Sequence, residues 1–371
     1  MGKALFYARA AWRSALVWCA PGVRGPRDRL YAAEKRNLWK GTVELPGVLA
    51  GAVRSQALAA RVGEMEAYLA AMLPLARFPF SRRAYLELSY LSTSPGIGIG
   101  VANYCRDVER AFLGHLERSG CPADLLDLCR ALCEPFGSNM IEVRAEFFAE
   151  EATRYTIFPG RWLDTPRHPR AYDAAFRRFP REFAGARTLM ESLAPDFFFP
   201  YVGLSFAFDG RREFKIYPTR FDREISHFAP GARGRALLER MGVPAHEIER
   251  VREFHERVRP RLAEGFVQVG AAVDERGEPT RASVILGHAP LAIYQAALDA
   301  IGLGEGARPA LDTFARELRV DAADSVSIRV KPEGVSPRVK VYRMDSYGWP
   351  WGKTLRETLG EKTPEAARTG T

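Results

Sequence analysis

The sequence repeats one plan five times: an amphipathic helical stretch is followed by two short alternating strands joined by a turn. The five strand pairs cover residues 85–104, 140–158, 201–217, 266–286 and 325–342. Asp209-Gly210 in the third pair is a strong hairpin signal, because both residues tolerate the positive φ of tight hairpin turns. Consecutive hairpins give ten mostly antiparallel strands, and closing them into a barrel removes the exposed edges of the sheet.

The segments around the strand pairs carry apolar residues at three- and four-residue spacing, which is typical of helices packed on one face. They cover residues 47–76, 106–134, 172–195, 234–263 and 289–318. Breaks at Gly120 to Pro122, Gly242 to Pro244 and Gly302 to Pro309 indicate that several are helix pairs. The sequence therefore predicts an α+β protein, in which a ten-stranded antiparallel β-barrel is surrounded by a ring of helices. We expect residues 45–348 to form this single domain, with 1–44 a poorly defined extension and 349–371 a tail.

Alternation along the strands predicts which face meets the helices. In the third pair the apolar residues Val202, Leu204, Phe206, Phe214 and Ile216 alternate with polar or small ones. Because the helices offer the only other apolar surfaces, the apolar set should face outward and the polar set should face a solvated lumen. An open sheet with one wet face would alternate in the same way. The many Gly, Ala and Ser residues in the polar set favour the closed barrel.

The polar set collects seven cations and four carboxylates, together with hydroxyl and amide side chains. Its members are Glu87, Ser89, Glu142, Arg144, Glu146, Arg154, Thr156, Glu213, Lys215, Tyr217, Gln268, Arg281, Ser283, Ser325, Ser327, Arg329, Arg338, Lys340 and Tyr342. A surplus of positive charge inside a barrel is costly unless an anion binds, and cations from several strands suit a diphosphate. We expect Arg144 and Arg329 instead to neutralise Glu142 and Glu146.

Composition excludes several other classes of protein. The chain has 54 Lys plus Arg against 45 Asp plus Glu, but the excess is spread along the chain without the basic block of a nucleic-acid arm. The five cysteines are odd in number and lack C-x-x-C spacing, which favours reduced thiols in the cytoplasm. No apolar run reaches the roughly 20 residues of a membrane span. The six histidines are scattered and no D-D-x-x-D cluster is present, so we expect no metal site and no required cofactor, while assistance by magnesium stays open.

Short motifs on these strands point to one family. They are Leu86-Glu87-Leu88-Ser89 in the first pair, Arg154-Tyr155-Thr156-Ile157-Phe158-Pro159 in the second, Lys215-Ile216-Tyr217 in the third, Arg281 after the turn of the fourth, and Arg338-Val339-Lys340-Val341-Tyr342 in the fifth. With the order of the repeats, they make residues 47 to 345 resemble the soluble aromatic prenyltransferases of the ABBA, or PT-barrel, family.

The resemblance implies transfer of a dimethylallyl or geranyl group from its diphosphate to an electron-rich aromatic ring, as in secondary metabolism. The acceptor would be an indole or tryptophan derivative, a phenol, or an aromatic side chain of a peptide, and the enzyme would be a monomer or homodimer. Glu87 would orient the acceptor and take up its proton. Tyr217 and Tyr342 would shield the allylic cation. The diphosphate would be held by Arg154, Lys215, Arg281, Arg338 and Lys340. The alternative is a non-catalytic barrel that carries an anionic amphiphile or another phosphate-bearing ligand, for which Glu87 would have no use.

Two departures from the family pattern bear on the substrates. The chain has Gly96, Gly98 and Gly100 where the indole branch usually has an Arg, so one diphosphate ligand is missing or is replaced by Arg329 or Arg144. Thr156 stands where a shielding Tyr is common. Small residues at both places predict a wider lumen, and hence a donor longer than dimethylallyl or a bulky acceptor.

Overall fold

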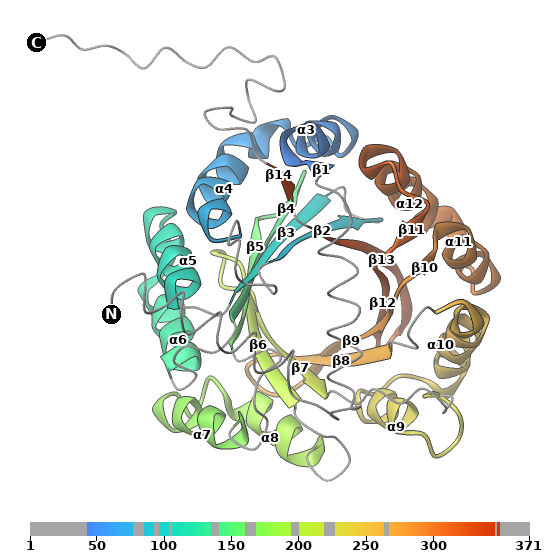
Figure 1. The fold of residues 1–371 in the computed structure, drawn as a ribbon. Coiled ribbons are helices and arrows are strands. Elements are labelled where there is room, and N and C mark those ends of the chain that lie inside the picture. The colour runs from blue at the N-terminus through green and yellow to red at the C-terminus, as the bar shows by residue number, and fades with distance from the viewer. Residues whose placement is uncertain are drawn as a thin grey trace, which may run out of the picture.

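The computed structural model describes residues 43–76, 85–92, 96–103, 106–134, 141–159, 168–193, 200–218, 227–262, 267–345 and 347–348. Ten antiparallel strands close into a barrel in the order β12-β13-β2-β3-β4-β5-β6-β7-β8-β9 (Figure 1). The strands are β2 (Tyr85–Leu91), β3 (Gly96–Asn103), β4 (Ile141–Phe148), β5 (Arg154–Pro159), β6 (Pro200–Phe206), β7 (Arg212–Pro218), β8 (Val267–Val273), β9 (Pro279–Leu286), β12 (Ser325–Lys331) and β13 (Gly334–Asp345). The predicted closed barrel and its five hairpins are confirmed.

Helices surround the barrel as a ring, two for each hairpin (Figure 1). They are α3 (Leu45–Ser55), α4 (Val62–Ala76), α5 (Arg106–Arg118), α6 (Ala123–Cys133), α7 (His168–Arg178), α8 (Ala184–Leu193), α9 (Arg233–Arg240), α10 (Ala245–Val258), α11 (Leu291–Ala300) and α12 (Gly304–Leu318). None of them is both long and apolar enough to cross a membrane.

Three of the helix pairs break where glycine permits a left-handed backbone. Gly120, Gly242 and Gly302 have φ of 79°, 72° and 74° and follow the ends of α5, α9 and α11. The predicted break from Gly302 to Pro309 was too long, because α12 begins at Gly304 and contains Pro309. The segments predicted as 47–76 and 172–195 are helix pairs as well.

The fifth hairpin differs from its prediction in the length of its turn. Strand β13 starts at Gly334, and the register jumps from Arg329 opposite Ser336 to Ile328 opposite Val339. Pro337 lies in this bulge, where its missing N–H group costs no ladder hydrogen bond. A bulge changes the direction of the neighbouring side chains, and Arg338 is the next residue.

Two short strand pairs were not predicted. Strand β1 (Val43–Glu44) pairs in parallel with β14 (Tyr347–Gly348), which links the beginning of the described helices to the end of β13. Strand β10 (Ala289–Pro290) pairs antiparallel with β11 (Ala322–Ala323) at the two ends of the α11–α12 pair.

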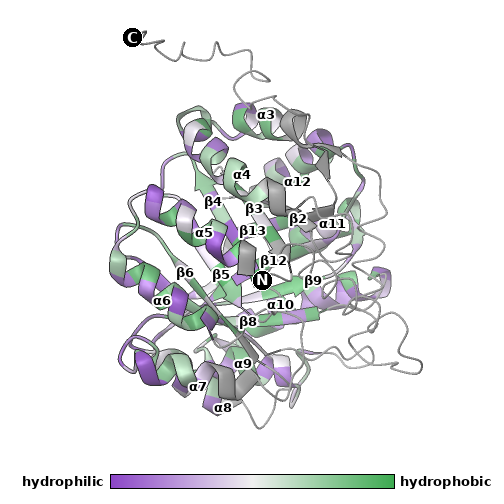
Figure 2. Ribbon diagram, turned by 60° about the vertical axis from the view of Figure 1, so that its left-hand side comes forward, coloured by the Kyte–Doolittle hydropathy of each residue, from purple (hydrophilic) through white to green (hydrophobic). Residues whose placement is uncertain are grey.

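The core lies between the barrel and the ring of helices. Val202, Leu204, Phe214 and Ile216 are fully buried, as the alternation predicted for the outward face. Tyr90 of β2 packs edge-on against Phe314 of α12, with ring centroids 5.7 Å apart. In Figure 2 the strands are mostly hydrophobic, whereas the helices alternate between hydrophobic and hydrophilic residues along their length. Because the apolar residues of the strands pack against the helices, the polar residues that alternate with them face the lumen.

Candidate functional site

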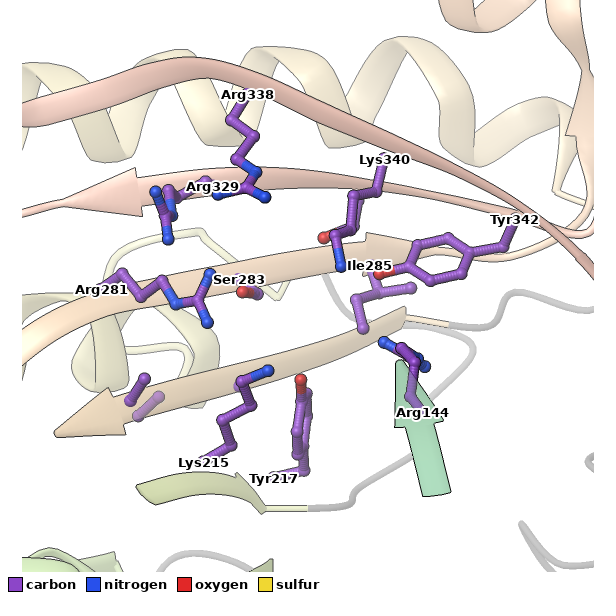
Figure 3. A pocket seen from close by; sticks show the side chains of 14 residues that line it. Arg144, Lys215, Tyr217, Arg281, Ser283, Ile285, Arg329, Arg338, Lys340 and Tyr342 are labelled. Carbon is purple, nitrogen blue, oxygen red and sulfur yellow. The ribbon is translucent and has the colours of Figure 1, made fainter. Parts of the chain in front are cut away.

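A cleft of about 510 Å³, counting the space that opens to solvent, lies inside the barrel. Residues of β4, β7, β8, β9, β12 and β13 line it, most of them from the polar set (Figure 3). They are Arg144, Lys215, Tyr217, Gly270, Ala271, Ala272, Arg281, Ser283, Ile285, Ser327, Arg329, Arg338, Lys340 and Tyr342.

Four of these side chains form the cationic wall: Lys215, Arg281, Arg329 and Arg338. They come from four different strands and extend toward a common region of the cleft (Figure 3). In the register of β9 and β12, Arg329 stands opposite Ser283, whose small side chain leaves room for the guanidinium. An anion in this region would therefore meet donors from several directions, which is the arrangement that a diphosphate needs.

The carboxylate of Glu213 lies against the cationic wall. Its Oε2 lies 2.6 Å from Nη2 of Arg281 and 4.0 Å from Nη1 of Arg154. Burial opposes ionisation of Glu213, but Arg281, Lys215 and Arg154 outweigh it and lower its pKa to about 2. Glu213 is therefore ionised at neutral pH.

The cations repel one another strongly. Burial, and then repulsion by Arg281, lowers the pKa of Lys215 well below its usual value. The same two causes lower the pKa of Arg329 to about 9 and that of Arg338 to about 10. Nε of Arg329, together with Nε and Nη2 of Arg338, is buried without a hydrogen-bond partner in the described part of the chain. Buried N–H groups of this kind are costly, and an acceptor bound beside Arg329 and Arg338 would remove this cost.

Hydroxyl groups and an aromatic ring flank Lys215. Its Nζ lies 3.4 Å from the hydroxyl of Thr156, which is hydrogen-bonded in turn to Ser205. The ring of Tyr217 lies directly over Gly270: a Cβ atom on residue 270 would come within 2.4 Å of the tyrosine ring. Only glycine allows this close approach, which brings the tyrosine to the edge of the cleft.

A second group of charges, the paired wall, consists of Glu142, Arg144, Glu146 and Lys340. Nη2 of Arg144 donates to Glu142 at 3.1 Å, and Lys340 forms an ion pair with Glu146. Both carboxylates are buried. Each carboxylate thus has its own cation, in contrast to the cationic wall.

The glycines of β3 explain how residues of β13 reach β4. Strands β2 and β3 lie between them in the barrel, and Gly98 and Gly100 stand opposite Glu146 and Arg144 in the register. Because these glycines have no side chains, Lys340 can reach Glu146, and the guanidinium of Arg144 can lie 5.6 Å from the ring centre of Tyr342. The glycines of β3 were predicted to widen the lumen, but these contacts fill part of the space above them.

Comparisons with known proteins agree on the architecture. A scan against models of protein families finds no match, and a search of curated proteins finds none either. Among solved structures, a 6-dimethylallyl tryptophan synthase is similar, with a TM-score of 0.52 and 13% identity over 82% of this chain and 96% of that chain. The 6-dimethylallyltryptophan synthase from Micromonospora olivasterospora, in complex with DMASPP and Trp, has a TM-score of 0.51 and 14% identity over 86% of this chain and 100% of that chain. The apo form of the prenyltransferase PriB has a TM-score of 0.51 and 16% identity over 81% and 96%.

This chain has the PT-barrel fold. Its closed ten-stranded barrel inside a ring of helices is the architecture that the resemblance implied.

The PT barrel brings together most of the predicted site residues. The cleft is lined by Lys215, Tyr217, Arg281, Arg338, Lys340 and Tyr342. Arg154 does not line the cleft; it is connected to these residues by its ion pair with Glu213. Glu87 lies on β2, opposite Gly100 of β3 and Met344 of β13, and its side chain lies outside the described part of the structure.

The expectation that Arg144 and Arg329 would neutralise Glu142 and Glu146 is right for Arg144 and wrong for Arg329. No ion pair among the described residues joins Arg329 to either carboxylate, and its main electrostatic neighbours are Arg281 and Arg338. The twist and tilt of the strands decide this, because they determine which side chains of distant strands meet across a lumen.

Two aromatic residues of the lumen were missed because only polar residues were collected. Phe148 of β4 lies under Arg338, with the guanidinium carbon 5.1 Å from the ring centre. Phe158 of β5 packs on Gly203 and meets Tyr217 edge-on, with centroids 5.7 Å apart. On its strand, each phenylalanine stands two residues after a polar residue of the lumen and therefore points to the same face. This alternation is the sequence signal that could have identified both.

The described residues hold no cluster of metal ligands, and their free thiols are buried. In the part of the chain that the structure describes, no three His, Cys, Asp or Glu residues are grouped to hold a metal ion. Cys121, Cys129 and Cys133 are buried free thiols, and burial raises the pKa of each. A thiol of raised pKa is a poor nucleophile at neutral pH.

Proposed function

We propose that the protein is an aromatic prenyltransferase, which transfers an allylic prenyl group from its diphosphate to an electron-rich aromatic acceptor. The observation that carries this proposal is the cationic wall, where four cations from four strands line one cleft inside a closed barrel, and Arg281 among them pairs with Glu213. The shared fold supports it, as do the bound ligands DMASPP and Trp of the Micromonospora olivasterospora enzyme.

In the proposed reaction the bond between the allylic carbon and the diphosphate oxygen breaks, and its electron pair leaves with the diphosphate. Lys215, Arg281 and Arg338 would stabilise the negative charge that develops on the leaving group, since preorganised donors act strongly in a site of low dielectric. Arg329 would replace the ligand that the glycines of β3 cannot supply. Arg154 would act from beside Glu213, and Lys340 from the paired wall. We expect these cations to suffice without a metal ion.

The allylic cation would lie against the rings of Tyr217 and Tyr342, whose faces attract positive charge. A carbon of the aromatic acceptor attacks the cation and forms the new carbon–carbon bond. The ring then loses a proton and becomes aromatic again. We assign the uptake of this proton and the orientation of the acceptor to Glu87, on β2 between β13 and β3.

We propose dimethylallyl or geranyl diphosphate as the donor, and an indole or tryptophan derivative, a phenol or a peptide aromatic side chain as the acceptor. The contacts across Gly98 and Gly100 fill part of the space that would suit longer donors. Dimethylallyl diphosphate is therefore the donor to test first.

The first experiment is a thermal-shift titration with the unreactive thiolodiphosphates of dimethylallyl, geranyl and farnesyl alcohols, together with inorganic pyrophosphate. A ligand at about one hundred times its dissociation constant adds roughly 2.7 kcal/mol to the free energy of unfolding, which raises the Tm measurably. A shift that depends on chain length would identify the donor. The absence of a shift with all four compounds would contradict the proposed site.

The second experiment separates an enzyme from a carrier. With the best donor and a panel of indoles, phenols and aromatic peptides, the wild type should form a prenylated product and release pyrophosphate. Glu87→Gln should lose about 100-fold or more of this activity while keeping the thermal shift with the thiolodiphosphate. Binding without turnover by the wild type over the whole panel would favour the non-catalytic barrel.

A further inference from the structure

Glu213 is an unexpected residue beside the cationic wall, because a carboxylate repels the anion that we assign to this site. It lies on β7, two residues before Lys215, and is hydrogen-bonded to Arg281 at 2.6 Å. Its side chain is 20% exposed, so it is largely removed from water. In register it stands opposite Ser205 of β6, whose neutral hydroxyl supplies no compensating charge.

The cations around Glu213 explain its position in the free protein. Of the neighbouring charges, Arg281 lowers the pKa of Arg154, Lys215, Arg329 and Arg338 most strongly, and Glu213 opposes the shift in all four. Glu213 is thus bonded to the cation that repels the others most. Glu151 opposes the shifts of Arg154 and Arg338 as well, but Glu213 is the carboxylate that acts on all four of these cations. In a cleft without substrate it provides part of the negative charge that such a cluster needs.

A diphosphate brings the same kind of charge to the same cations. Two anions close together repel each other, and repulsion is strong where water is largely excluded. Inorganic pyrophosphate has one more ionisable oxygen than a prenyl diphosphate, so a fixed carboxylate opposes the released product more than the donor. The carboxylate also holds Arg281 by a charge-assisted bond that the ligand must replace.

We propose that Glu213 is an internal counter-ion, which competes with the diphosphate for Arg281 and thereby weakens the binding of the pyrophosphate released by the reaction. This inference rests on the proposed function, because it assigns the bound anion to the cationic wall. It gives Glu213 a role in product release rather than in bond making.

The test is the affinity for inorganic pyrophosphate, measured by calorimetry in a phosphate-free buffer of fixed ionic strength. Glu213→Gln keeps the shape of the side chain and removes its charge, and it should bind pyrophosphate about tenfold more tightly than the wild type. It should bind dimethylallyl thiolodiphosphate more tightly by a smaller factor, and its Tm without ligand should be lower. A merely structural role predicts the opposite change in affinity, because damage to the site weakens binding.

Glu275→Gln is the matched control. Glu275 accepts a hydrogen bond of 2.6 Å from Nε of Arg212, at the neighbouring position of β7 but in an exposed pair. Removing its charge should leave the affinity for pyrophosphate unchanged. An equal gain in both variants would overturn the proposal, because it would reflect net charge alone.

Unchanged or weaker pyrophosphate binding by Glu213→Gln would also overturn the counter-ion role while leaving the proposed function intact. If the wild type binds neither pyrophosphate nor a thiolodiphosphate, the proposed function fails, and the inference that rests on it fails as well. Should Glu213→Gln not fold, Glu213→Asp decides in its place, because it draws the charge back from Arg281 and should tighten binding by a smaller factor.

Discussion

The two charged walls of the lumen use the same kinds of residue in different ways. In the paired wall, Arg144 and Lys340 each meet a buried carboxylate, Glu142 and Glu146. In the cationic wall, Lys215, Arg281, Arg329 and Arg338 share Glu213. The difference indicates where a ligand belongs: a wall that is neutral by itself needs no anion, whereas a wall with surplus charge is completed by one.

The largest expected effect comes from breaking the paired wall. Lys340→Met removes a cation and leaves Glu146 buried and unpaired, so the free energy of unfolding should fall by about 3–5 kcal/mol. Urea denaturation followed by circular dichroism measures this change. The double variant Lys340→Met with Glu146→Leu should recover most of the loss, because an apolar pair replaces the ion pair. No recovery would mean that Glu146 has another essential partner.

The corresponding change in the cationic wall should act on activity instead. Arg338→Met keeps much of the packing over Phe148 and removes a cation whose buried N–H groups lack partners. We expect kcat/KM to fall about 100-fold, as on removal of one transition-state donor. The free energy of unfolding should rise by about 1 kcal/mol, because a repelling charge is gone. Equal losses of activity and stability would show that the two walls do not differ.

The pH dependence of stability tests the carboxylate of Glu213, which is hydrogen-bonded to the cationic wall. The pKa of Glu213 is lowered from 4.5 to about 2, so its ionised form stabilises the folded state. The wild type should exceed Glu213→Gln by about 2 kcal/mol in free energy of unfolding above pH 4.5. This difference should shrink as the pH falls through 4.5 and disappear near pH 2. A difference that stays constant over this range would mean that the charge of Glu213 does not matter.

The smallest expected effect is that of metal removal. If the cationic wall alone neutralises the leaving group, turnover should be the same in EDTA and in millimolar magnesium chloride. A steady-state assay of pyrophosphate release with the best donor measures this. Activity that is lost in EDTA and restored by magnesium would show that the four cations are insufficient.

Much of the fold could be predicted because its signals are local. The alternation in β6 and β7, the turn at Asp209-Gly210 and the glycines after α5, α9 and α11 each depend on a few neighbouring residues. The bulge at Pro337 was missed, since the sequence shows a proline but not the register that accommodates it. The pair β1–β14 joins segments about 300 residues apart, and no local pattern indicates such a contact.

The sequence by itself determined which strand residues face the lumen, because alternate residues of a strand point to opposite faces whatever the strand pairs with. It therefore identified all four residues of the cationic wall as residues of the lumen. Only the tertiary structure decided which charges meet. Arg144 and Lys340 pair with carboxylates of β4, whereas Arg329 lies among other cations that repel it. The physical reason is that pairing across a lumen depends on strand tilt and on the gaps left by glycines such as Gly98 and Gly100, which are properties of the closed barrel as a whole.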